Sequence, residues 1–210
     1  MKQYKDHAVS PVVGVMLMLV VTIIIAAVVS GFAGGLVKGQ TKAPTATITG
    51  TFSVRSGLAI NHAGGSAIPS AEMVITTRDG PTFGAGLDSS TVNTVNLANV
   101  TNSAGTPIAF FNTATSSVDG YNVTSFNPGD TWYVNITNCN PQLLQPSVAP
   151  TSGTLSWSSS TGQWSFSNPT DTLWSLDFVN PSNVGKQFYL DINDKASGAQ
   201  IARAVVTITG

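Results

Sequence analysis

The sequence predicts an α+β protein in which a long N-terminal hydrophobic helix is followed by an all-β head domain of the sandwich or barrel type. Two observations predict this class. Residues 8–37 form a run without a single charge, and about 20 apolar residues are enough to span a bilayer. Beyond residue 44, short segments rich in Val, Ile, Thr, Phe and Trp alternate with turn clusters, a pattern typical of strands.

The uncharged run is longer than a membrane span requires. At a rise of about 1.5 Å per residue it would reach roughly 45 Å, against ~30 Å for the hydrocarbon core. Lys2 and Lys5 precede it, which favours a cytoplasmic N-terminus and an external head. On hydropathy alone the segment is a plain membrane anchor. A cleaved secretory signal, cut near Gly31-Phe32-Ala33, fits less well because its apolar region is normally about 7–15 residues long.

The start of the run has a characteristic order of residues. A short polar leader ends in the small residue Ala8, and Val9-Ser10-Pro11 follows, with Gly14 three residues later and an unbroken apolar segment behind it. This combination resembles the N-terminal segment of archaeal (euryarchaeal) type IV pilins. The resemblance is strong over about 30 residues, and in the remainder of the chain only the general character of the sequence is similar.

The resemblance implies processing and assembly. A membrane peptidase is expected to remove the leader, residues 1–8, between Ala8 and Val9, leaving the helix 9–38 on the mature protein. The helix would be held first in membrane lipid and then packed against copies of itself by pilus assembly machinery. The fifth residue after the cut is Val13, so the glutamate that bacterial pilins use there is missing. Register would then depend on apolar packing.

The helix itself suits both lipid and a filament core. Pro11 falls in the first turn, where its missing N–H leaves no bond unmade. Gly14, Ala26, Ala27 and Gly31 are small and would let neighbouring backbones approach closely, although glycine is also simply commoner in membrane helices. A helix that is apolar on every side must be buried all round.

A short joint at 39–44 is expected to connect the helix to the head. Gly39 loosens the helix end and Pro44 prevents its continuation.

The head, residues 45–210, is predicted to be built of short strands. Asn61 to Gly65 is interpreted as a turn, and strand spacing favours a sandwich or barrel. The stretch from Leu58 to Gly65 and the closing hairpin from Asp194 to Ala202 resemble archaeal pilin heads. The expected strands are 45–54, 71–77, 107–111, 120–124, 131–137, 154–158, 163–167, 172–178, 187–193 and 200–209.

Composition argues against several classes of function. Charged residues make up 9% of the chain, against a typical ~25%. From Gly39 onward, six basic residues stand against nine acidic ones, a net charge of −3. With no basic patch, a nucleic acid is not an expected partner.

No catalytic constellation is evident. The two histidines are His7, in the leader, and His62, in the expected turn, and a nucleophile needs a base within reach. Asp191, Asn193 and Asp194 faintly resemble a calcium loop, but Lys195 stands where a ligand is needed, which favours a hairpin turn. We therefore expect no enzymatic activity, no cofactor and no metal.

Export of the head would expose modification sites. The sequons that begin at Asn99, Asn122 and Asn135 are candidates for N-glycosylation, although chance alone explains three in so Ser/Thr-rich a chain. Cys139 is the single cysteine, so no internal disulfide is expected.

The sequence thus favours a structural subunit of an archaeal type IV pilus-like filament, active in adhesion or in contact between cells and surfaces. The alternative is a single-pass, membrane-anchored β-domain that binds a ligand or surface polymer. A secreted β-domain comes third. The mature N-terminus separates them: Val9 for the pilin, Met1 or Lys2 for the anchor, and Gly34 for the secreted domain.

Overall fold

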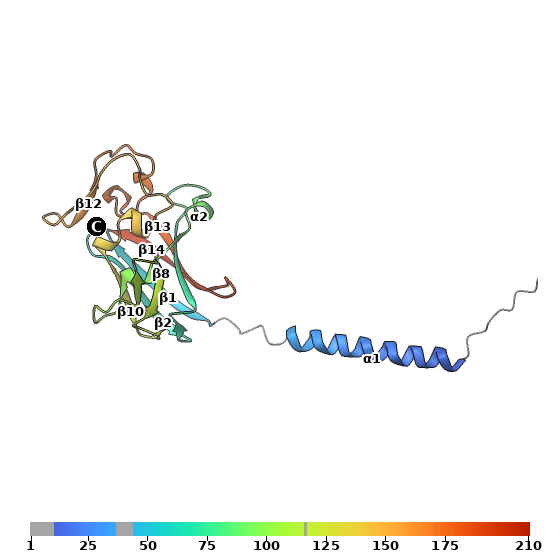
Figure 1. Ribbon diagram of the computed structural model, residues 1–210. Helices are drawn as coiled ribbons and strands as arrows, with labels where there is room; N and C mark the ends of the chain where they lie inside the picture. The colour runs from blue at the N-terminus through green and yellow to red at the C-terminus, as the bar shows by residue number, and fades with distance from the viewer. Residues whose placement is uncertain (1–10, 37–43, 116) are drawn as a thin grey trace, which may run out of the picture. The chain divides into compact units, whose positions relative to one another are not determined.

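The computed structural model describes residues 11–36, 44–115 and 117–210. The chain divides into two units, Met1–Lys42 and Ala43–Gly210, which are considered separately. The first contains one helix, α1 (Pro11–Leu36), of 26 residues (Figure 1), or about 39 Å at the standard rise. The Thr22 hydroxyl donates to the Leu19 carbonyl at 2.9 Å, so this polar side chain is satisfied within the helix, as an apolar setting requires.

The head is organised around one curled, eight-stranded sheet (Figure 1). The strand order is β5-β4-β13-β14-β1-β2-β10-β6. Neighbours are antiparallel except β1 and β14, which run parallel with Phe52 opposite Ile208. The strands are β1 (Ala46–Ser53), β2 (Gly57–Gly65), β4 (Met73–Asp79), β5 (Asn93–Thr94), β6 (Val100–Thr101), β10 (Thr131–Asn135), β13 (Gln187–Asp194) and β14 (Gln200–Thr209).

Smaller elements cover the sheet. Three two-stranded pairs join β3 (Ile68–Pro69) to β9 (Ser125–Phe126), β7 (Ala109–Asn112) to β8 (Ser117–Tyr121) and β11 (Leu155–Ser158) to β12 (Gln163–Phe166). The short helices are α2 (Leu87–Ser90) and α3 (Pro141–Leu144), with 3₁₀ turns η2 (Leu97–Asn99), η3 (Ile136–Asn138), η4 (Trp174–Leu176) and η5 (Pro181–Asn183).

Strand alternation places one face of the sheet in the core. Phe52 of β1 and Phe188 of β13 are buried there together with Phe178. The rings of Phe178 and Phe188 stack with centroids 4.0 Å apart, and Phe52 meets both edge-on. Gly50 of β1 allows this packing, because a Cβ there would lie 2.6 Å from Cγ2 of Val206.

The α+β class is confirmed, with an N-terminal apolar helix and a mostly β head. Two local predictions were wrong. Residues 61–65 belong to β2 rather than to a turn, because this part of β2 pairs along β1 as far as Gly65 opposite Ala46. Residues 172–178 form no strand; the Asp171 carboxylate accepts the Leu173 and Trp174 amides, a local bond that favours a turn over a sheet.

Candidate functional site

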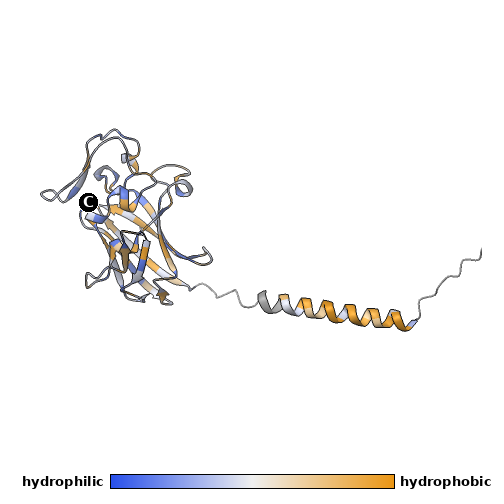
Figure 2. Ribbon diagram, in the orientation of Figure 1, coloured by the Kyte–Doolittle hydropathy of each residue, from blue (hydrophilic) through white to orange (hydrophobic). Residues whose placement is uncertain are grey.

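The helix is the most distinctive surface of the protein. Within its own unit every residue from Pro11 to Phe32 is exposed, and this 22-residue segment is long and apolar enough to cross a membrane, at about 33 Å. Figure 2 shows hydrophobic colour along the helix. Such a surface requires a cover of lipid or of other apolar helices.

The small residues predicted to mediate packing lie along this surface. Pro11 opens the helix. A Cβ added at Gly14 or at Gly31 would meet nothing within 4 Å, so no contact among residues 11–36 requires either glycine. Ala27 and Gly31 are four residues apart and share one helix face. Ala26, the residue before Ala27, lies on a different face. The predicted cleavage residues, Ala8 and Val9, lie outside the described residues.

The three sequons occupy different environments. Asn135 is exposed at the end of β10, and its Oδ1 accepts the Thr137 amide at 3.1 Å and the Thr137 hydroxyl at 3.0 Å. Asn122 is also exposed, but its Nδ2 donates to the Pro107 carbonyl at 2.9 Å. Asn99 is half-buried in η2.

Two of the sequons are brought together by strand pairing. Strands β10 and β6 are antiparallel and pair Val134 with Val100, so Asn135, one residue after Val134, and Asn99, one residue before Val100, lie at the same end of this pair. Asn122 follows β8 and lies elsewhere in the topology.

The isolated polar residues are structural. His62 is fully buried in β2, with Nε2 at 3.0 Å from the Ser66 carbonyl and its ring edge-on to Phe126. The Cys139 thiol donates to the Val134 carbonyl at 3.4 Å. Burial raises the pKa of Cys139 to about 12, so the reactive thiolate is not formed near neutral pH.

The four tryptophans differ in burial. Trp132 and Trp174 are buried, and Trp157 and Trp164 are half-buried against each other, with ring centroids 5.6 Å apart. The Trp164 indole donates to the Ile136 carbonyl at 2.8 Å. All four therefore take part in packing within the head.

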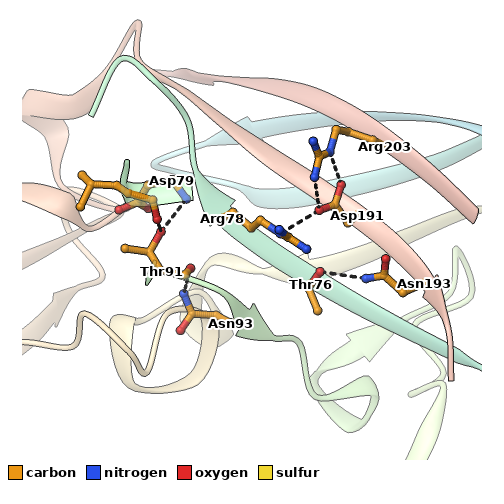
Figure 3. A network of polar contacts seen from close by, with 9 residues as sticks. Thr76, Arg78, Asp79, Thr91, Asn93, Asp191, Asn193 and Arg203 are labelled. Atoms are coloured by element: carbon orange, nitrogen blue, oxygen red, sulfur yellow. Dashed lines mark hydrogen bonds and ion pairs between the residues drawn. The ribbon is translucent and has the colours of Figure 1, made fainter. Parts of the chain in front are cut away.

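A buried ion cluster lies on the outer face of the sheet (Figure 3). The Asp191 side chain is 0% exposed, while those of Arg78 and Arg203 are 28% and 38% exposed. Arg203 holds both carboxylate oxygens, at 2.6 and 2.9 Å. Arg78 Nε lies 3.0 Å from Oδ2. Asn193 and Thr76 form a hydrogen bond beside the cluster.

Sequence reasoning missed the buried acidic residues of the head, Asp79, Asp177 and Asp191. One signal was available for Asp79. It follows Met73, Ile75 and Thr77 at intervals of two, and this spacing puts it on the core face of β4. The expected strand, 71–77, ends two residues before Asp79, whereas β4 continues to it.

Comparison with known proteins gives one match. Residues 7–48 match the family model described as archaeal type IV pilin, N-terminal. No curated protein and no solved structure matches the chain. The matched segment includes the residues that carry the resemblance and the whole membrane-length stretch of α1, and it ends within β1. The resemblance to archaeal type IV pilins is thereby confirmed for the N-terminal segment, residues 7–48.

Proposed function

We propose that the protein is a structural subunit of an archaeal type IV pilus-like surface filament. The observation that carries this proposal is a helix that is apolar all round and has no cover within its own unit, in a segment that matches the pilin N-terminal family. Membrane lipid would cover it in the precursor, and copies of the same helix would cover it in the filament.

The proposed organisation follows the sequence. Residues 1–8 are the leader, 9–38 the membrane and filament-core helix, 39–44 the joint and 45–210 the external head. A prepilin-type peptidase and the assembly machinery of the membrane are the expected partners. The role is adhesion or contact between cells and surfaces, carried by the head rather than by catalysis.

The filament test is a charge in the middle of the helix. Ile24→Asp should cost roughly 2.5–3.5 kcal/mol in membrane insertion, and it leaves an unpaired charge among packed helices. Electron microscopy should show no surface filaments, while the head should stay resistant to limited proteolysis. Ile24→Leu is the matched control and should assemble normally. Normal filaments built throughout from the aspartate variant would show that this helix is not the core.

The second candidate is a membrane-anchored β-domain, favoured by a 22-residue segment that suffices to span a bilayer unaided. N-terminal sequencing of the mature protein separates the two. The pilin should begin at Val9, and Ala8→Phe should leave the uncut precursor. A mature chain that still begins at Met1 or Lys2 would favour the anchor.

Among the sequons we propose that Asn135 is glycosylated in preference to Asn122. Both are exposed, but the Asn122 Nδ2, the atom that must accept the sugar, is held by the Pro107 carbonyl, whereas Asn135 uses Oδ1 to bind Thr137. Mass spectrometry should find higher occupancy at Asn135. Thr137→Val should abolish that glycan only. Higher occupancy at Asn122 would contradict this reasoning.

A further inference from the structure

Two buried acidic side chains in the head lack partners for most of their oxygens. Asp79 and Asp177 are both 0% exposed. Oδ2 of Asp79 and both carboxylate oxygens of Asp177 make no hydrogen bond within the described residues. Removing a carboxylate from water is costly unless it is paired, coordinated or protonated. Each such buried oxygen calls for a specific explanation.

A single glutamine ties the two acidic residues together. The Nε2 of Gln145 donates to Oδ1 of Asp79 at 3.3 Å and to the Leu176 carbonyl at 3.2 Å. Its Oε1 accepts the Phe178 amide at 2.7 Å. The amide of Gln145 therefore contacts Asp79 and the residues on both sides of Asp177. It holds the end of β4 beside the turn that follows η4.

Burial and neighbouring carboxylates both affect the pKa of Asp177. Burial is the main cause that raises the pKa of Asp177, to about 9, and repulsion from Asp79 and Asp171 adds to it. No hydrogen bond joins Asp79 to Asp177 within the described residues. The geometric link between the two acidic residues is therefore Gln145, which contacts Asp79 and both neighbours of Asp177.

The other neighbours do not neutralise the pair. Burial raises the pKa of Asp79 to about 7, opposed by hydrogen bonds from Thr91 and Gln145 and by the charge of Lys186. The Lys186 ammonium lies over the Phe83 ring, 4.7 Å from its centroid. It forms no ion pair within 4.0 Å of Asp79 in the described structure, so it offsets the charge only from a distance.

We propose that Asp79 and Asp177 together bind one Ca²⁺ ion in the head. Calcium takes six to eight oxygen ligands and accepts carboxylates, carbonyls and water in flexible geometry. Three free carboxylate oxygens supply the charged part of such a shell. Mg²⁺ fits less well, because it keeps several of its waters and demands a near-ideal octahedron. Without nitrogen or sulfur ligands, a zinc or copper site is disfavoured.

The affinity should be modest. The described part of the chain holds no group of three or more His, Cys, Asp or Glu side chains suited to a metal, so two carboxylates carry the charge. Few charged ligands place a site at the weak end of calcium binding, with Kd of about 10⁻⁴–10⁻³ M, as in extracellular modules. An external head could fill such a site only at these calcium levels.

The test is calcium titration of the full chain in detergent micelles. Isothermal calorimetry with CaCl₂ at pH 8 should show about one binding event per head, and thermal unfolding should move to higher temperature with CaCl₂ and return with chelator. MgCl₂ should have little effect. Tb³⁺ should give luminescence on tryptophan excitation, since the Trp174 carbonyl accepts the Asp177 amide at 3.2 Å.

Two variants assign the site. Asp177→Asn keeps the side-chain size and should weaken calcium binding at least about tenfold, which is about 1.4 kcal/mol. Asp119→Asn, at an exposed position of β8, should leave it unchanged. Absence of calcium binding by the native chain overturns the proposal, whatever the variants do. A different result would instead identify a protonated acid pair: calcium has no effect on the native chain, and Asp177→Asn raises the unfolding temperature in chelator.

Discussion

The ion cluster around Asp191 predicts an asymmetry between two substitutions. Asp191 is 0% exposed and has no route to water, whereas Arg203 is 38% exposed. Removing the aspartate frees an arginine that can turn to solvent. Removing the arginine leaves a carboxylate that stays buried. We therefore expect Arg203→Met to be the more damaging change, although it keeps the aliphatic stem.

The magnitudes follow from the contacts. Arg203→Met removes both hydrogen bonds to Asp191 and the stacking of the guanidinium over Tyr189 at 4.8 Å. Breaking a buried pair from one side costs about 3–5 kcal/mol, and the remaining contact with Arg78 favours the lower value, about 3 kcal/mol. Asp191→Asn loses charge-assisted bonds but leaves two arginines whose side chains are both partly exposed, so about 1–2 kcal/mol is expected.

The assay is denaturant unfolding of the full chain in micelles, followed by tryptophan fluorescence, because the tryptophans lie only in the head. The double variant should be less destabilised than the sum of the singles, since both report on one pair. Equal costs for the two single changes, or a larger cost for Asp191→Asn, would refute the claim that burial of the carboxylate dominates.

Three further outcomes are expected. Gly50→Ala should destabilise the head by about 1–3 kcal/mol through overpacking against Val206, measured by the same unfolding assay; an unchanged free energy of unfolding would contradict this. Cys139 should react with a thiol reagent only under denaturant, because its thiol is buried and its pKa is raised; rapid labelling of the native protein would contradict this. In chelator, the raised pKa of Asp79, about 7 against 3.8, means that the folded form keeps a proton that the unfolded form has lost. The stability that Asp79 contributes is complete below pH 3.8 and is lost as the pH rises through about 7. The free energy of unfolding should fall by at most about 4 kcal/mol over this range. Asp79→Asn should flatten this pH dependence.

Much of the architecture could be predicted from local patterns. The apolar helix is evident from composition, and β1, β13 and β14 from alternation that persists over eight to ten residues. The two wrong predictions have separate physical causes. The glycines at the end of β2 suggested a turn, but pairing with β1 extends the strand through them. The hydrophobic residues after Asp171 suggested a strand, but its side chain caps a turn.

The buried acidic pair could not be predicted in the same way. Alternation marks Asp79 as facing the core, but what meets it there depends on Gln145 and Asp177, which come from segments far along the chain. Pattern reasoning fixes the face of a strand on which a residue lies. It does not identify the loops that close over that face, and the candidate calcium ligands meet only after those loops are placed.

The parallel pairing of β1 with β14 has a consequence for the order of folding. Each half of the sheet, β5-β4-β13-β14 and β1-β2-β10-β6, is antiparallel within itself, and only this seam joins the two. It is closed by contacts such as the Thr209 hydroxyl donating to the Phe52 carbonyl across 157 residues. A loop of that length makes the contact entropically late. Until it forms, two open strand edges are available to other copies, so a delay in β14 would expose the head to exchange of strands between subunits.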